Sequence, residues 1–274
     1  MIETGLRPRG LGPRAAYDVT MAAADGGTTE RRGARPFLTA EWRYLAMLNF
    51  EIAPAVLRPY IPRGTELDEW QGRTLVSVVG FRFLDTRVRG LSVPWHRDFD
   101  EVNLRFYVRR EVDGEVRRGV SFVRELVPRH AIALIARLVY NEPYVACPMR
   151  SRIDRTHGLE EAVAVEYAWR HARAWQRVSV RAFGRAAPVE TGTESEFVTE
   201  HYWGYTPQRD GSTLEYEVRH PRWRVWPVLD GRLDCDVAAV YGPAFVEALS
   251  NPPASVLLAE GSAITVFSPT WLPR

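Results

Sequence analysis

The chain has 274 residues, of which 46% are hydrophobic and 26% charged, and its formal net charge is only +2. A globular protein of this composition can bury a core without metals or disulfides. The small net charge argues against a nucleic-acid binder that works by phosphate neutralisation. Lysine is absent, so all 36 basic residues are arginine. Without lysine, no side chain of the protein can form an imine with a carbonyl substrate.

The chain carries no sign of a metal, a disulfide framework or a membrane span. Cys147 and Cys235 form no Cys-x-x-Cys motif and predict a reducing compartment. The six histidines show no helical i, i+4 spacing, so we expect neither a metal nor another cofactor. No signal-peptide pattern and no run of about 18 apolar residues occurs. We therefore expect a cytoplasmic protein with no membrane or nucleic-acid partner, and homo-oligomer formation is left open.

Two parts of unequal length are predicted along the chain. Residues 1–34 are rich in Gly, Ala, Arg and Thr and have no apolar periodicity, which is typical of a disordered tail. Residues 35–274 are predicted to form a single domain, because mainly β domains of this size occur as one unit.

The first half of this domain predicts two strands, a hairpin and two helices. In chain order these are a strand at Trp42–Phe50, a short helix at Ala53–Tyr60, a strand at Arg73–Phe83, hairpin strands at 102–109 and 116–126, and a helix at Pro128–Tyr140. The dipeptide Asp113-Gly114 lies between the hairpin strands and is favoured in two-residue type I′ turns.

The second half predicts mostly strands. These are Tyr144–Ile153, Ala162–Trp169, Trp175–Phe183, His201–Tyr205, Thr213–His220, Trp223–Val228, Ser255–Glu260 and Ile264–Phe267, with a short helix at Pro243–Leu249. No alternation of strands with helices is present, so the chain belongs to the mainly β class rather than to a Rossmann or TIM fold.

One face of the first hairpin strand carries most of its polar side chains. At period-2 spacing this face holds Glu101, Asn103, Arg105 and Tyr107. Such a stripe faces either solvent or an enclosed interior. The two-residue turn places Arg105 opposite Phe122, and apolar neighbours suit an interior better. A buried arginine requires a carboxylate, either from Glu101 or from a ligand, so both a structural ion pair and a ligand site remain open.

A second cluster spans 199–205 and packs an acid, a histidine and aromatic residues closely together. As a strand it would place His201 and Trp203 on one face and Tyr202 on the other. Both a buried aromatic strand and a pocket wall have this composition.

These segments resemble the DUF2071 family, also called YqjF-like. The matching stretches are Leu57-Arg-Pro-Tyr-Ile-Pro, Val78-Val-Gly-Phe-Arg-Phe, Phe99–Val108, Phe197–Trp203 and Gly261–Phe267. The family is similar to the acetoacetate decarboxylase-like superfamily, and this resemblance implies an antiparallel, cone-shaped β-barrel with a few short helices around a pocket.

The resemblance also implies positions for site residues. Glu101 stands where the superfamily has a strand acid, and Met149 and Arg150 stand where its Pro-Lys-Lys strand carries lysines. A thioether cannot form an imine and a guanidinium is not a nucleophile, so decarboxylation through a Schiff base is excluded.

The expected function is that of a small-molecule enzyme with non-covalent acid–base chemistry. The resemblance implies lyase-like proton transfer, dehydration or cyclisation of an oxo-acid or polyketide-like metabolite. Glu101, His201 and Tyr202 are the catalytic candidates, with burial expected to raise the pKa of Glu101. The substrate-binding candidates are Arg105, Asn103, Tyr107, Met149, Arg150, Phe122 and Trp203. The alternative is a non-catalytic protein that binds a small metabolite in the same cavity.

Overall fold

A computed structural model describes residues 35–92, 97–129, 143–156 and 161–272. Seven strands close into a barrel in the order β16, β1, β3, β5, β6, β12, β13 and back to β16. Their bounds are β1 (Pro36–Glu51), β3 (Leu75–Val88), β5 (Phe99–Val112), β6 (Glu115–Val127), β12 (Trp203–Pro207), β13 (Thr213–Arg219) and β16 (Ser255–Phe267). Both the tail at 1–34 and most of the predicted helix at Pro128–Tyr140 lie outside the described residues.

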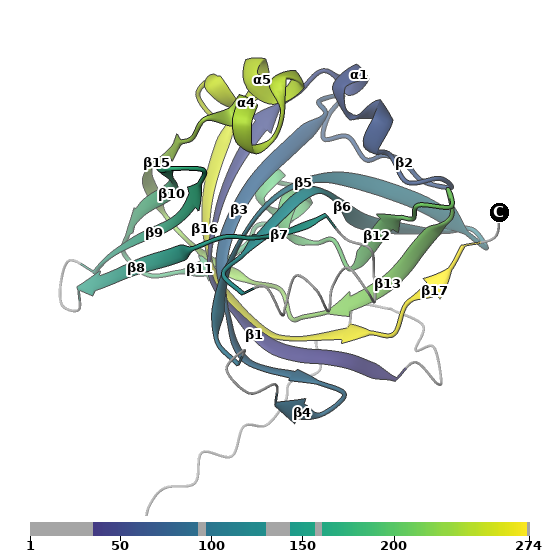
Figure 1. Cartoon of the computed structure of the whole chain (residues 1–274). Helices are drawn as coiled ribbons and strands as arrows, with labels where there is room; N and C mark the ends of the chain where they lie inside the picture. The colour runs from purple at the N-terminus through teal and green to yellow at the C-terminus, as the bar shows by residue number, and fades with distance from the viewer. Residues whose placement is uncertain (1–34, 93–96, 130–142, 157–160, 273–274) are drawn as a thin grey trace, which may run out of the picture. The chain divides into compact units, whose positions relative to one another are not determined.

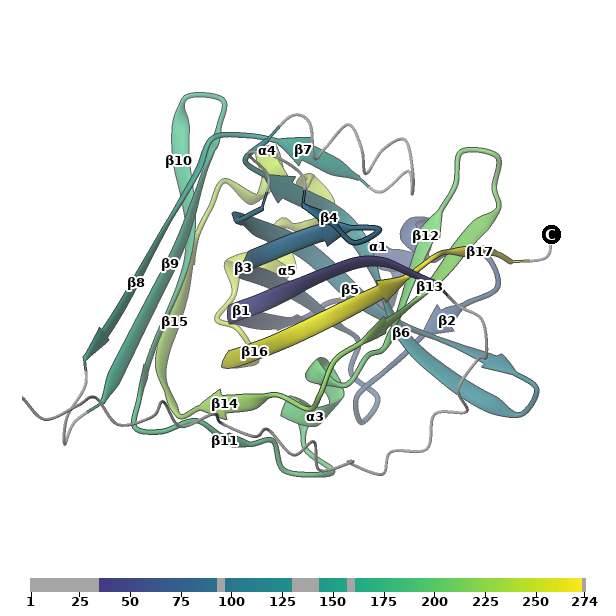
Figure 2. The ribbon, with the colours of Figure 1, turned by 90° about the horizontal axis from the view of Figure 1, so that it is seen from below.

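A separate four-stranded sheet stands beside the barrel (Figures 1 and 2). Its antiparallel order is β15 (Val228–Asp234), β10 (Ala174–Phe183), β9 (Ala162–His171) and β8 (Met149–Thr156). Six short strands extend the barrel sheet: β2 (Glu66–Leu67), β4 (Leu91–Ser92), β7 (Tyr144–Ala146), β11 (Ala187–Pro188), β14 (Arg224–Trp226) and β17 (Thr270–Trp271).

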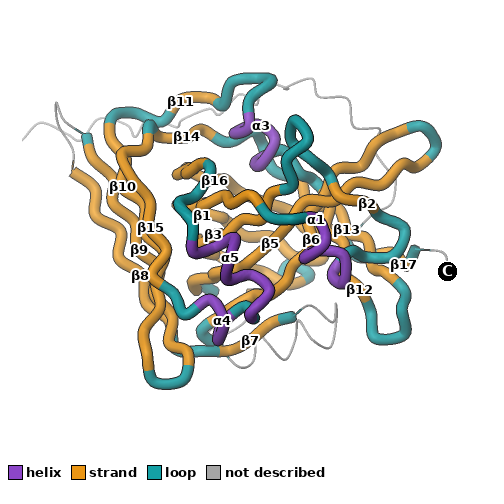
Figure 3. The backbone as a smooth tube through the Cα atoms, turned by 90° about the horizontal axis from the view of Figure 1, so that it is seen from above, coloured by secondary structure: helices purple, strands orange, loops and turns teal. Residues whose placement is uncertain are grey.

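The helices that the structure describes are short. They are α1 (Pro54–Leu57), α3 (Glu194–Thr199), α4 (Val237–Val240) and α5 (Val246–Ser250), with 3₁₀ turns at Arg58–Tyr60 and Pro243–Phe245. Figure 3 shows α1, α4 and α5 over one end of the barrel strands, with α3 apart from them. None of the described helices has the length and hydrophobicity needed to cross a membrane.

The barrel is mixed rather than wholly antiparallel, which corrects the expected architecture. Consecutive strands joined by the hairpin at Asp113-Gly114 are antiparallel, and both turn residues have positive φ, as a type I′ turn requires. However, β6 pairs in parallel with both β12 and β7. A tight hairpin forces antiparallel pairing, but β6 and β12 are separated by the whole segment that builds most of the second sheet, so their relative direction is not fixed by a turn.

Hydrophobic cores lie on both faces of the barrel wall. The outer core packs side chains such as Val102, Leu104 and Phe106 of β5 against β9 and β10. The inner core fills part of the barrel with residues such as Val79 and Phe81. Since both faces of β5 are buried, its polar stripe cannot face solvent, and the interior interpretation is confirmed.

Several element boundaries differ from the predicted ones. The strand predicted at Tyr144–Ile153 breaks at Pro148, which has no amide to continue the ladder, and the chain then passes from the barrel to the second sheet. The two strands predicted after Ser255 are one continuous strand, β16. The strand predicted at His201–Tyr205 begins only at Trp203, because the preceding residues form α3 and a loop. Strand β15 was not predicted.

Candidate functional site

The barrel interior contains a cavity of about 170 Å³ with mostly apolar walls. The walls are rich in aromatic side chains, including Trp42, Phe81, Phe83, Phe99 and Trp223. Trp42 contacts Phe81 and Phe83 edge to face, with ring centroids 5.3 and 5.8 Å apart. Because an apolar cavity of about 150 Å³ holds benzene, this cavity has room for one small organic molecule.

Three neighbouring side chains of β5 bring the polar chemistry into this cavity. Glu101, Asn103 and Arg105 line it and are 3%, 3% and 8% exposed. Alternate residues of a strand share a face, so these side chains follow one another along one wall. The Asn103 amide donates to Glu101 Oε1 at 2.9 Å, while Asn103 Oδ1 has no partner. This wall therefore offers a carboxylate, an amide oxygen and a guanidinium to an occupant.

Arg105 is a buried cation without a carboxylate partner in the described part of the chain. Its Nη2 donates to the Val198 carbonyl of α3 at 2.9 Å, and its Nε makes no hydrogen bond. A structural ion pair with Glu101, one of the two predicted alternatives, is not formed. A buried guanidinium without a counter-ion is costly, so a ligand anion would be stabilised here.

The β6 strand contributes Phe122 and a second carboxylate, Glu125. Strict alternation from Phe122 would have placed Arg124 inside. A β-bulge shifts the register between Leu104 and Arg105, so that Leu104 pairs with Arg124 and Arg105 with Phe122. The bulge moves Glu125 to the inner face. The period-2 pattern did not predict Glu125 as a cavity residue, because no local sequence signal indicated the bulge.

His201 lies in the loop between α3 and β12 and also lines the cavity. Its Nε2 lies 3.2 Å from Asp68 Oδ2, which accepts a 2.7 Å hydrogen bond from Arg118 Nε. Burial lowers the pKa of His201 to about 4, although the hydrogen bond to Asp68 opposes this change. Burial acts to raise the pKa of Asp68, but the hydrogen bonds from His201 and Arg118 outweigh it and hold that pKa below its usual value. At neutral pH the pair is thus a neutral imidazole and a carboxylate.

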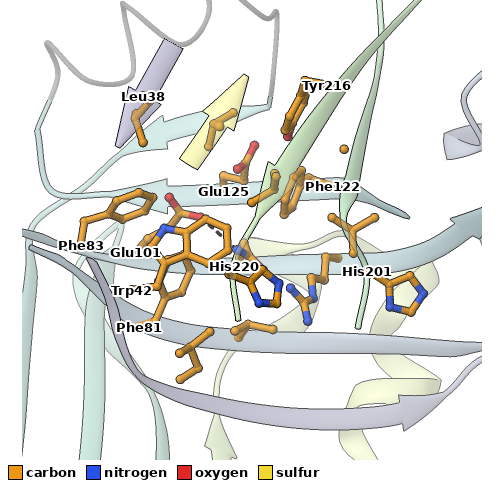
Figure 4. A pocket seen from close by; sticks show the side chains of 18 of the residues that line it. Leu38, Trp42, Phe81, Phe83, Glu101, Phe122, Glu125, His201, Tyr216 and His220 are labelled. Carbon is orange, nitrogen blue, oxygen red and sulfur yellow. Dashed lines mark hydrogen bonds between the residues drawn. The ribbon is translucent and has the colours of Figure 1, made fainter. Parts of the chain in front are cut away.

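A second histidine, His220, lines the cavity and was not predicted as a site residue. It directly follows β13, where Tyr216, Val218 and His220 alternate on the cavity side. This period-2 pattern was present in the sequence and could have identified it. Burial lowers the pKa of His220 to about 4 as well. Figure 4 shows His201 on the far side of the cavity from Phe83.

The remaining predicted site residues divide into two groups. Trp203 lines the cavity, as Phe122 does. Tyr107 is fully buried beside it and bonds Ser77 at 2.6 Å, so it supports the wall without lining it. Tyr202 points elsewhere and hydrogen-bonds Glu200, because the expected strand alternation does not exist before Trp203. Burial raises the pKa of Tyr202, so its hydroxyl stays protonated.

Met149 and Arg150 do not reach the cavity. Met149 packs against the outer core at the start of β8, and the exposed Arg150 places its guanidinium 4.3 Å from the ring centroid of Trp175. The break at Pro148 is the reason, because it carries this segment out of the barrel before Met149. The expectation that Met149 shares one cavity with Glu101 and Arg105 is therefore wrong.

Fold and cavity together define a closed β-barrel protein with an interior, mostly apolar cavity. The model of the DUF2071 family, described as an uncharacterized conserved protein, matches residues 39–263, and the chain belongs to this family. The uncharacterized protein YqjF of Bacillus subtilis (strain 168) is 27% identical over 188 residues, which cover 66% of this chain and 72% of that protein.

Solved structures of acetoacetate decarboxylase-like enzymes share the fold. The enduracididine biosynthesis enzyme MppR with bound HEPES superposes with a TM-score of 0.61 at 14% identity, covering 87% of this chain and 88% of that chain. MppR has also been solved with pyruvate. The acetoacetate decarboxylase of Legionella pneumophila gives a TM-score of 0.56 at 13% identity and covers 93% of both chains. At such identities the likeness establishes the fold alone.

Proposed function

We propose that this protein is a small-molecule enzyme that performs non-covalent acid–base chemistry on an oxo acid inside its barrel. The observation that carries the proposal is Arg105, a buried guanidinium that lines the cavity without a carboxylate partner among the described residues. A carboxylate or enolate oxygen of a ligand would complete its coordination through charge-assisted hydrogen bonds.

The second requirement of such chemistry is a proton carrier close to the bound anion. Glu101 lies on the same wall, four residues before Arg105, and Asn103 between them holds one of its oxygens. We assign Glu101 the role of general acid–base and Arg105 the stabilisation of negative charge on the substrate oxygen. Proton transfer next to a carbonyl, dehydration and cyclisation of a polyketide-like metabolite all use this pair of roles.

Acetoacetate decarboxylase-like folds support this proposal as analogy. MppR has been solved with pyruvate and with the condensation product of pyruvate and imidazole 4-carboxaldehyde. The chain departs from amine catalysis because it has no lysine. The mostly apolar cavity walls would equally suit a protein that only holds its ligand, so the test must separate binding from reaction.

Titration calorimetry with phenylpyruvate tests the anion site. We expect Arg105→Gln to weaken binding at least about tenfold, because a charge-assisted hydrogen bond is lost. Arg109→Gln is the matched control, since Arg109 lies on the same strand but is exposed and pairs with Glu66. Equal binding by the wild type and Arg105→Gln, with both variants folded by circular dichroism, would refute the anion site.

Exchange of the ligand's methylene protons in D₂O, followed by proton NMR, tests catalysis. We expect the protein to accelerate this exchange and Glu101→Gln to reduce the acceleration by roughly 10²-fold or more. Binding without any acceleration would identify a non-catalytic metabolite-binding protein instead.

A further inference from the structure

The second sheet has a free edge at β8 within the part of the chain that the structure describes. Strand β8 pairs with β9 along its whole length and with no other described strand, and Figure 2 shows it as the outermost strand of the sheet. It has 8 residues, which is long for an edge strand. Its outward N–H and C=O groups can pair with another extended chain. No residue of β8 lines the barrel cavity, so a role of this edge is separate from the proposed function.

The pairing with β9 determines which backbone groups of β8 point to the free edge. The Arg170 amide donates to the Pro148 carbonyl at 2.9 Å, so residues 148 and 170 form a hydrogen-bonded pair. Hydrogen-bonded and non-hydrogen-bonded pairs alternate along an antiparallel ladder, and the even-numbered residues of β8 therefore bond to β9. Ser151, Ile153 and Arg155 direct their N–H and C=O groups to the free edge instead.

The even-numbered side chains of β8 form a charged row on the exposed face of the sheet. Arg150, Arg152 and Asp154 are exposed, and Arg152 Nε lies 2.7 Å from Asp154 Oδ2. The opposite face carries Met149 and Ile153, which pack against the outer core. Charged side chains on an edge strand prevent edge-to-edge pairing when they meet like charges. Because β8 carries both signs, the effect of its charges depends on the register of the pairing.

Antiparallel pairing of two β8 strands about a two-fold axis at Ile153 satisfies both the backbone and the charges. Ile153 would exchange two hydrogen bonds with Ile153 of the partner subunit, since its backbone groups point to the free edge. Arg152 would lie opposite Asp154 of the partner subunit, so that positive and negative charges alternate both along and across the strands. The adjacent registers, centred on residue 152 or 154, would place two arginines or two aspartates opposite each other.

We propose that β8 is the interface of a homodimer in which the second sheets of two copies join into one continuous antiparallel sheet. Charge complementarity identifies the partner as a second copy of this chain, because the charges of Arg152 and Asp154 complement themselves in one register. A two-fold interface requires such self-complementarity. The backbone hydrogen bonds hold the two strands together, and the charges select the register.

Sedimentation velocity over a concentration series tests the interface with the full chain. We expect the wild type to dimerise and Arg152→Asp to raise the dissociation constant of the dimer at least about tenfold, because two symmetry-related attractions become repulsions. Combining Arg152→Asp with Asp154→Arg exchanges the signs and should restore the dissociation constant of the wild type. A wild type that stays monomeric at about 100 μM would overturn the proposal.

The matched control is Arg232→Asp, which makes the same change of charge on the opposite edge of the same sheet. Arg232 is exposed on β15, so its substitution should leave the dissociation constant unchanged. Circular dichroism verifies that each variant is folded. An equal loss of dimer in Arg232→Asp and Arg152→Asp would show that net charge, and not β8, governs association. Failure of the double variant to regain the dimer would refute the proposed register.

Disulfide trapping tests the register by distance. Residues 152 and 154 of opposite copies would form a non-hydrogen-bonded pair with Cα atoms about 4.5 Å apart, within reach of a disulfide. An equimolar mixture of Arg152→Cys and Asp154→Cys should therefore give a linked dimer, and this mixed dimer retains one Arg152–Asp154 pair. In either variant alone the new thiols lie on diagonal positions, with Cα atoms about 7–8 Å apart, and should link poorly.

Non-reducing electrophoresis and peptide mass spectrometry identify the linked residues. The wild type, whose Cys147 and Cys235 are free, is the control for links through the native thiols. A disulfide between residues 152 and 154 in the mixture would support the register. Its absence, or equal linking in either variant alone, would refute the register and with it the proposed interface.

Discussion

The two faces of β5 differ in almost every property although they belong to one strand. Val102, Leu104, Phe106 and Val108 on the outer face are fully buried in a close-packed core against the second sheet. Glu101, Asn103 and Arg105 on the inner face are nearly as buried but line a cavity, and Asn103 Oδ1 and Arg105 Nε have no hydrogen-bond partner. The outer face is packed and apolar, whereas the inner face keeps unpaired buried polar atoms, which lower stability.

The comparison shows that burial alone does not distinguish a core from a site. The distinguishing property is whether buried polar atoms have hydrogen-bond partners. Among the described residues that line the cavity, five have a buried polar atom without one: Trp42 Nε1, Thr86 Oγ1, Asn103 Oδ1, Arg105 Nε and His201 Nδ1. A protein selected for stability alone would pair these atoms or replace them with apolar groups. Their concentration in one cavity favours a functional interpretation.

Substitutions at two adjacent residues of β5, one on each face, should differ most in their effect on the free energy of unfolding. Leu104→Ala removes a fully buried side chain from the outer core and should lower the free energy of unfolding by about 2–5 kcal/mol. Asn103→Ala removes one hydrogen bond and one unsatisfied oxygen, so its cost should stay near 1 kcal/mol. Urea unfolding measures both. Equal losses would show that the inner face is as tightly packed as the outer one.

The sequence predicted this strand well because its information is local. The alternation from Glu101 to Val108, the Asp113-Gly114 turn and the pairing of Arg105 with Phe122 are all set by neighbouring residues and are confirmed. The interior position of Arg105 followed from its cross-strand partner. A barrel with short helices was also predictable, with help from the family resemblance.

The sequence could not predict features that depend on distant or irregular contacts. Glu125 reaches the cavity only through a bulge, and Asp68 meets His201 across 133 positions of chain. The parallel pairing of β12 with β6 depends on a long connection rather than on a turn. Met149 was misplaced because an alignment based on resemblance did not register the break at Pro148.

Measuring stability as a function of pH tests whether the buried His201 stays neutral in the folded protein. The pKa of His201 is about 4 in the folded protein and about 6.5 in an unfolded chain. Between these values the unfolded state binds a proton that the folded state does not, so stability falls as pH falls. From pH 7 to pH 5 His201 should contribute a loss of about 2 kcal/mol.

The control for this titration is His201→Phe, which has no titrating ring at that position. Urea unfolding at pH 7, 6 and 5 should show a shallower pH dependence in the variant than in the wild type. Asp68 has a lowered pKa and acts in the same direction, but only near and below pH 4. Identical slopes for the two proteins would mean that His201 is not held neutral by its surroundings.

Truncation of residues 1–34 should change the stability of the protein much less than Leu104→Ala or a shift from pH 7 to pH 5. These residues lack apolar periodicity, and the match to the family model starts at residue 39. If the segment makes no core contacts, as its composition predicts, it contributes little to stability, and we expect the melting temperature to move by no more than about 2 °C. A shift of about 5 °C in differential scanning calorimetry would contradict the predicted tail and extend the domain toward the N-terminus.

Borohydride treatment in the presence of an oxo acid should leave the mass of the folded domain unchanged. This result would limit the inner face of β5 to non-covalent chemistry. Reduction traps an imine only when a nucleophilic amine attacks the carbonyl of the oxo acid. The chain has no lysine, and Arg105 cannot replace one because its guanidinium remains protonated at any working pH.

Incubation with acetoacetate or pyruvate and borohydride should therefore add no mass to residues 36–274, as mass spectrometry of the intact and digested protein would show. A stoichiometric adduct in that range would require a covalent mechanism, and the assignment of Glu101 and Arg105 to non-covalent proton transfer would have to be abandoned. With no adduct, any proton exchange that Glu101→Gln abolishes must proceed through acid–base catalysis on a bound, unmodified substrate.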